Sequence, residues 1–131
     1  MKEETTEGRT GKQYDIGERT RAFALAVIRL YASLPRSTPA QIIGRQVLRS
    51  GTSVGALFSA ASRGRSSAEF ISKVEVGLQE LEETDYWLQL LVGAEIVRPE
   101  KVVPLRQEAG ELMAILVTCV KKVKQRTTGA G

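Results

Sequence analysis

The side chains that could do chemistry in this sequence are a run of carboxylates, one thiol and a set of arginines. Five acids fall between residues 74 and 85 with no base among them, and clustered carboxylate oxygens are ligands that suit Ca²⁺ or Mg²⁺. Their spacing points them several ways around one helix, whereas oxygen-only sites usually draw ligands from several elements. We therefore expect no metal site and no cofactor.

The 131-residue chain contains no histidine, which excludes several catalytic centres at once. A Ser-His-Asp triad, a His-Glu-x-x-His zinc site and a di-iron site built on Glu-x-x-His all need that residue. No glycine-rich phosphate loop ending in Lys-Ser or Lys-Thr is present. Cys119, the one thiol, lies on an apolar helical stripe, which favours a small buried side chain over a nucleophile. We predict a protein that is not an enzyme.

Basic residues gather between positions 36 and 73, where six bases accompany a single acid. At helical spacing Arg45, Arg49 and Arg63 share one face. Three interpretations stay open. The face is solvated and forms local ion pairs, or it meets the acidic face of a neighbouring copy in a closed ring, or it follows a phosphate backbone.

Four segments with helical periodicity must position these residues: 15–34, 39–63, 67–97 and 100–125. Their apolar residues recur at alternating spacings of four and three, the seam pattern of left-handed bundle packing. No stretch alternates with the period of two that a strand needs. The connections are only a few residues long, which predicts an all-α, antiparallel up-down-up-down four-helix bundle.

Length and composition fit one domain, with 42% hydrophobic residues, 26% charged residues and a net charge of +4. We expect a bundle over residues 15–125 between flexible polar tails at 1–14 and 126–131. No run approaches the roughly 18–20 apolar residues of a membrane span, so we expect no membrane partner. The lone cysteine is typical of a reducing, cytoplasmic setting.

Several of the expected helices carry a second apolar stripe beside the one that a bundle core requires. The third segment adds Ile71, Leu78, Trp87 and Leu90, for example. Two alternatives account for the excess: a wide core stripe, or an exposed patch that another subunit covers. The second alternative, together with the charge segregation, predicts an oligomer interface that includes Ile42, Leu48, Phe58, Glu75, Glu82 and Trp87.

The middle of the chain resembles a known bacterial family. The likeness rests on residues 47–56 (Val-Leu-Arg-Ser-Gly-Thr-Ser-Val-Gly-Ala), 66–73, and 83–91 (Glu-Thr-Asp-Tyr-Trp-Leu-Gln-Leu-Leu), and covers roughly residues 20 to 124. These runs are similar to the bacterial four helix bundle proteins, which include proteins encoded in intervening sequences of 23S ribosomal RNA genes. That family is related to the accessory variability determinant of diversity-generating retroelements.

The resemblance implies a homopentameric ring of antiparallel bundles without catalytic activity. Because the retroelement relatives bind nucleic acid and associate with a reverse transcriptase, it also implies RNA or DNA and such an enzyme as partners. The alternative is a self-assembling bundle without nucleic-acid affinity. One departure concerns Leu57 and Ala60, which stand where the family usually has Asn and Glu. The nucleic-acid-binding residues that the likeness implies are Arg45, Arg49, Arg63, Arg65 and Lys73.

Overall fold

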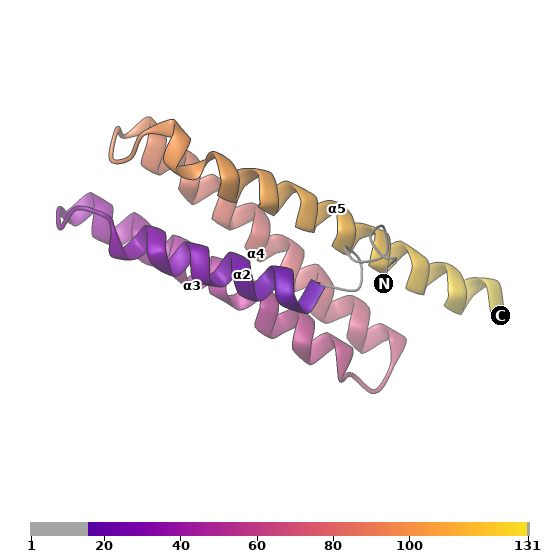
Figure 1. Cartoon of the computed structure of the whole chain (residues 1–131). Helices are drawn as coiled ribbons and strands as arrows, with labels where there is room; N and C mark the ends of the chain where they lie inside the picture. The colour runs from indigo at the N-terminus through magenta and orange to yellow at the C-terminus, as the bar shows by residue number, and fades with distance from the viewer. Residues whose placement is uncertain (1–15, 131) are drawn as a thin grey trace, which may run out of the picture.

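The computed structural model describes residues 16–130, and within that range every regular element is an α-helix. The helices are α2 (Ile16–Ala32), α3 (Thr38–Ser62), α4 (Ser67–Gly93) and α5 (Pro99–Ala130). Consecutive helices run antiparallel and pack side by side, with α5 returning to α2 (Figure 1). The predicted all-α four-helix bundle is confirmed. The predicted tail at 1–14 lies outside the described residues.

The core is one cluster of aliphatic side chains that includes a single buried aromatic residue, Phe23. Leu81, Leu88 and Leu112 are fully buried in it. Leucine side chains of this kind each stabilise the fold by about 1.5–3 kcal/mol through burial of apolar surface. Most of the buried residues belong to the apolar stripes that the four-three spacing predicted; Ala40, Gly44, Gly51, Val102 and Val120 are buried as well and lie outside those stripes.

The seam between α3 and α4 has a buried polar pair at its centre. The hydroxyls of Ser50 and Thr84 lie 2.7 Å apart, and both residues are fully buried. Each hydroxyl also lies within hydrogen-bond distance of a carbonyl one turn earlier in its own helix, at Gln46 and Glu80 respectively. Every polar atom of the pair therefore has a partner, which is the condition for burying hydroxyls without a large penalty.

Glycines on α3 let α2 approach closely. A Cβ atom added at Gly51 would lie 2.8 Å from a methyl carbon of Val27, and one at Gly55 would lie 3.0 Å from the hydroxyl of Thr20. Neither position has room for a larger side chain. The two glycines each cost about 1 kcal/mol of helix propensity relative to alanine, a cost that close packing of α2 on α3 offsets.

The contact between α2 and α5 is narrower and more polar. Arg19 donates from Nε and Nη2 to both carboxylate oxygens of Glu108, at 2.9 and 2.7 Å. Its Nη2 also lies 2.7 Å from Glu111. Because α2 has 17 residues and α5 has 32, they are about 25 and 48 Å long, and α5 extends well past the first turn of α2.

Helix α4 ends at Gly93, earlier than the predicted residue 97. Its end is a Schellman motif, in which Ile96 N–H donates to Leu91 C=O at 2.9 Å and Glu95 N–H donates to Val92 C=O at 2.9 Å. Glu95 has φ 60°, in the left-handed region that glycine usually fills. Ile96 and Val97 then fold back against the core, so their apolar character, which suggested more helix, serves the turn.

Helix α5 continues to Ala130, where we expected it to end at 125 and a tail to follow. The threonine hydroxyls explain how the extra turn is satisfied. Thr127 donates to the carbonyl of Lys124 at 2.9 Å, and Thr128 donates to the same carbonyl at 2.9 Å. Bonds of this kind let threonine sit in a helix without exposing an unpaired donor.

Within residues 16–130, no helix combines the length and the apolar character needed to cross a lipid bilayer.

Candidate nucleic-acid interface

The predicted basic face of α3 is divided by the structure. Arg49 reaches across to α4, where its guanidinium nitrogens lie 3.2 Å from Glu80 and 2.8 Å from Glu83. Its charge is therefore met within the same chain, which is the local ion-pair interpretation. Arg45 is exposed on α3 but lies 18 residues, or about 27 Å of helix, from Arg63. These two positions do not form one compact site.

Three of the predicted residues do come together, where α3 ends and α4 begins. Arg63 follows α3 and donates to the hydroxyl of Ser59 at 2.6 Å. Arg65 is exposed in the turn, and Lys73 is half-buried in the second turn of α4. The turn itself is fixed by Ser66, which caps α4 by accepting from the N–H of Glu69 at 3.1 Å.

The carboxyl end of α5 brings four more cations to this region. Lys121, Lys122 and Arg126 are exposed, and Lys124 is anchored to α4 by an ion pair of 3.5 Å with Glu75. Figure 1 shows the end of α5 and the α3–α4 turn at the same end of the bundle. We call this group the basic end; it consists of Arg63, Arg65, Lys73, Lys121, Lys122, Lys124 and Arg126.

The basic end concentrates the positive charge of the molecule. Residues 62–75 and 118–130 contain seven bases and two acids, a net charge of +5, which exceeds the +4 of the whole chain. One of those acids, Glu75, is taken by Lys124, and the other, Glu69, accepts from the backbone N–H of Arg65 at 2.7 Å. The remaining cations have no carboxylate within the part of the chain described, so they are available to an external anion.

In the sequence, Lys121, Lys122, Lys124 and Arg126 stand at the end of a helix, where cations are favourable for the helix dipole whatever else they do. Sequence order hides that they lie at the same end of the bundle as Arg63 and Arg65, since some 55 residues separate the two groups. The antiparallel pairing of α4 with α5 closes that gap. Fold topology, rather than any local motif, assembles the site.

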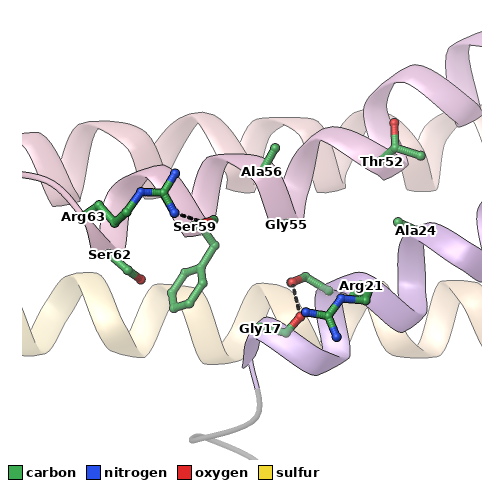
Figure 2. A pocket seen from close by; sticks show the side chains of 11 residues that line it. Gly17, Arg21, Ala24, Thr52, Gly55, Ala56, Ser59, Ser62 and Arg63 are labelled. Atoms are coloured by element: carbon green, nitrogen blue, oxygen red, sulfur yellow. Dashed lines mark hydrogen bonds between the residues drawn. The ribbon is translucent and has the colours of Figure 1, made fainter.

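A groove beside the basic end separates α2 from the carboxyl half of α3. Its volume is about 470 Å³. Figure 2 shows Arg21 from α2 and Arg63 from α3 at its two sides, with the small residues Gly55, Ala56 and Ser59 between them. Phe58 also lines the groove and is half-buried.

The predicted interface residues fall into two groups. Leu48, Phe58 and Trp87 are half-buried against the core of their own chain, which is the wide-stripe alternative. Ile42 is 57% exposed. Glu75 is paired with Lys124, and Glu82 is exposed. Trp87 packs edge-on against Tyr86, with ring centroids 5.1 Å apart, and its indole N–H is buried without a partner among the described residues.

An apolar surface on α2 was missed by the sequence analysis. Leu25 and Ile28 lie one turn apart on the outer face and are 44% and 45% exposed. Ala22 and Ala32 continue the same side of the helix. Arg29 is the one charged residue from Ala22 to Ala32, so this part of α2 is apolar on its outer face as well as on its inner face, a pattern typical of helices that are covered on both sides. A second stripe on residues 22–32 could have revealed it.

The remaining reactive groups have structural roles. Burial raises the pKa of the Cys119 thiol, which lowers the fraction present as the nucleophilic thiolate. The Arg106 guanidinium, which donates to Asp85 at 2.7 Å, lowers the pKa of that carboxyl and keeps it ionised in an ion pair. Among residues 16–130, no group of three or more acids, cysteines or histidines is placed to hold a metal ion.

The fold and the surface together define a class of protein: small, basic four-helix bundles that expose unpaired cations and apolar side chains. Within that class, the chain belongs to the family of 23S rRNA-intervening sequence proteins, whose family model matches residues 12–118. It is also similar to a crystal structure from Bacteroides thetaiotaomicron VPI-5482, described as a protein with unknown function from the S23 ribosomal protein family. The two are 32% identical with a TM-score of 0.76, over 81% of this chain and 98% of that one. No curated protein matches. Neither matching description names a catalytic activity.

Proposed function

We propose that this protein is a non-enzymatic, self-assembling accessory protein that binds nucleic acid through the basic end. The observation that carries the proposal is the set of cations gathered there that have no carboxylate partner in the described structure, whereas Arg19, Arg49 and Arg106 each pair with a carboxylate on a neighbouring helix. Unpaired exposed lysines and arginines suit the phosphate backbone, which they bind with little regard to base sequence. The description of the family as proteins of 23S rRNA intervening sequences supports an RNA setting.

The test is binding of a labelled RNA hairpin, followed by fluorescence anisotropy at several salt concentrations. The wild-type protein binds, and its affinity falls as salt rises, because each phosphate contact releases a counterion. Reversing three charges in Lys121→Glu, Lys122→Glu and Arg126→Glu lowers the affinity by about 100-fold or more. These side chains are exposed, so the thermal unfolding of the variant stays close to that of the wild type.

A matched control carries the same change in net charge at the opposite end of the bundle. Arg36, Arg98 and Lys101 are exposed there, and Arg36→Glu, Arg98→Glu and Lys101→Glu remove as much positive charge as the first set. The control keeps most of the affinity if the basic end makes the contacts. Equal losses in the two triple variants contradict the assignment of this end, because they reveal a response to net charge alone.

Self-assembly is the second part of the proposal, and the outer face of α2 supports it. Leu25 and Ile28 present apolar surface that a second copy would cover. Exposed Ile42 on α3 adds to the apolar surface available. The pentameric ring implied by the family resemblance would gather five basic ends on one particle, which converts weak single contacts into avid binding.

Light scattering tests this part directly. We expect a mass of five 14.3-kDa chains for the wild type, and a smaller particle for Leu25→Glu with Ile28→Glu. An unchanged mass in that variant moves the interface away from α2. If the wild type is a pentamer that ignores RNA at physiological salt, the alternative of a purely protein-binding bundle replaces the nucleic-acid proposal. A reverse transcriptase remains the candidate protein partner that the resemblance implies.

A further inference from the structure

We propose that the groove between α2 and α3 binds a single-stranded segment of nucleic acid, one strand threading between Arg21 and Arg63. This inference rests on the proposed function and deepens it, because it names the form of nucleic acid that the protein prefers. The basic end alone would hold any phosphate backbone, single or double.

Charge on both walls is the first argument. Arg21 stands on α2 and Arg63 follows α3, and both line the groove. None of the ion pairs within residues 16–130 involves either of them. A guanidinium offers a planar fork of donors that matches two phosphate oxygens. The bond of 2.6 Å from Arg63 to Ser59 holds that side chain at the wall, so part of its ordering cost is met before a ligand arrives.

The floor of the groove is the second argument. Gly17, Ala24 and Ala56 have no side chain beyond Cβ, so a ligand can approach the helix backbones closely. The hydroxyls of Ser59 and Ser62 add hydrogen-bonding groups of the kind that contact sugars and phosphates. The volume of about 470 Å³ lies within the range of small-ligand sites, roughly 300–1,000 Å³.

An aromatic side chain decides between single and double strands. Phe58 lines the groove and is half-buried, so one part of its ring is held by the core while another part faces the groove. An unstacked base can pack on such a ring, an interaction worth about 1–3 kcal/mol per base. The bases of a duplex are already stacked inside it, so a duplex would reach the arginines and leave Phe58 and the groove floor unused.

The test narrows the groove without changing charge. Ala56 is exposed, lies between the arginines and accepts a larger side chain in a helix, so Ala56→Leu fills part of the space. Ala114→Leu, at an exposed position of α5 outside the groove, is the matched control. Anisotropy is measured with a labelled oligouridylate and with an RNA duplex of the same length. We expect Ala56→Leu to weaken oligouridylate binding by about tenfold, with duplex binding and the control unchanged.

Other results overturn the proposal in distinguishable ways. If Ala56→Leu binds oligouridylate as the wild type does while the Lys121, Lys122 and Arg126 reversals weaken it, the groove is not the site and the basic end keeps its function. Equal weakening for both RNAs also removes the preference for single strands. If the wild type binds neither RNA, the proposed function fails together with the groove. Should Ala56→Leu unfold, Ser62→Leu at the exposed end of α3 narrows the same groove without changing charge, with its loss expected on the oligouridylate.

Discussion

The middle of the bundle and its basic end both carry cations, but the two regions treat them differently. In the middle, Arg19, Arg49 and Arg106 each reach a carboxylate on a neighbouring helix. At the basic end, Arg65 lies in a turn and Lys122 near a helix terminus, and neither forms an ion pair with a carboxylate of residues 16–130. Arg21 and Arg45 also lie on α2 and α3 without an ion pair among the described residues, so a cation joins two helices only where the neighbouring helix presents a carboxylate to it.

The same contrast applies to packing. The middle allows almost no change of side-chain volume, since glycines and fully buried hydroxyls set the distances between its helices. The end is built from exposed side chains on helix termini. Substitutions in the middle should therefore change stability and leave binding intact, and those at the end should do the reverse. Four predictions test this division.

The largest effect on stability is expected at Gly51. In Gly51→Val the new side chain would meet Val27, which is fully buried, and α2 would have to move away from α3. We expect the free energy of unfolding to fall by about 3 kcal/mol or more, measured by urea denaturation. Gly110→Ala is the control, because a Cβ atom there meets nothing within 4 Å; it should stabilise the fold by about 0.5–1 kcal/mol. Equal behaviour of the two variants would show that α2 is not closely packed.

Arg19 is expected to give the next largest effect. Its side chain is 15% exposed and makes three short contacts with Glu108 and Glu111. Arg19→Met keeps the apolar stem and removes the charge, which should cost about 2 kcal/mol in urea denaturation. RNA affinity of the folded protein should not change. If the variant is fully folded and still binds RNA more weakly, Arg19 belongs to the binding surface, and the middle and the basic end do not have separate roles.

Arg49 and Arg126 make a matched pair, since each substitution by glutamine removes one positive charge. Arg49 is neutralised by Glu80 and Glu83, whereas Arg126 has no described carboxylate partner. Arg126→Gln should lower RNA affinity about threefold and reduce the slope of log affinity against log salt by roughly one unit, while Arg49→Gln changes neither. Equal salt slopes for the two variants would indicate that the basic face of α3, which includes Arg49, contacts RNA as well.

The features of the fold that could be predicted from the sequence are those that depend on interactions within one segment. The apolar spacing identified four helices and their core residues, because periodicity is written within each segment. The end of α4 was misplaced because Ile96 and Val97 continue the apolar character of the helix while Glu95 takes a left-handed turn. The end of α5 was misplaced because Thr127 and Thr128 satisfy their hydroxyls within the helix.

The candidate site was predictable only in part. Arg63, Arg65 and Lys73 were identified because they lie close together in the sequence. Lys122 and Arg126 were not grouped with them, because their place at the same end of the bundle depends on the long-range pairing of α4 with α5. Arg49 was left with three possible partners, and the structure adds the pairs with Glu80 and Glu83, because a sequence does not show which helix faces which acid. Charge on a face is visible in sequence, but its neutralisation across helices is not.

The smallest effect is expected where the middle contains a polar pair, at Ser50 and Thr84. Removing one hydroxyl in Thr84→Val leaves Ser50 within hydrogen-bond distance of the carbonyl of Gln46, so the cost should be only about 0.5–1 kcal/mol. Removing both, in Ser50→Ala with Thr84→Val, should cost no more than the single change, because no buried donor then lacks a partner. A double-mutant cycle in urea measures the coupling. A double variant clearly less stable than either single variant would show that the two hydroxyls stabilise the α3–α4 seam more than a dry apolar contact does, and that polar groups in the middle, like those of Arg19, hold helices together.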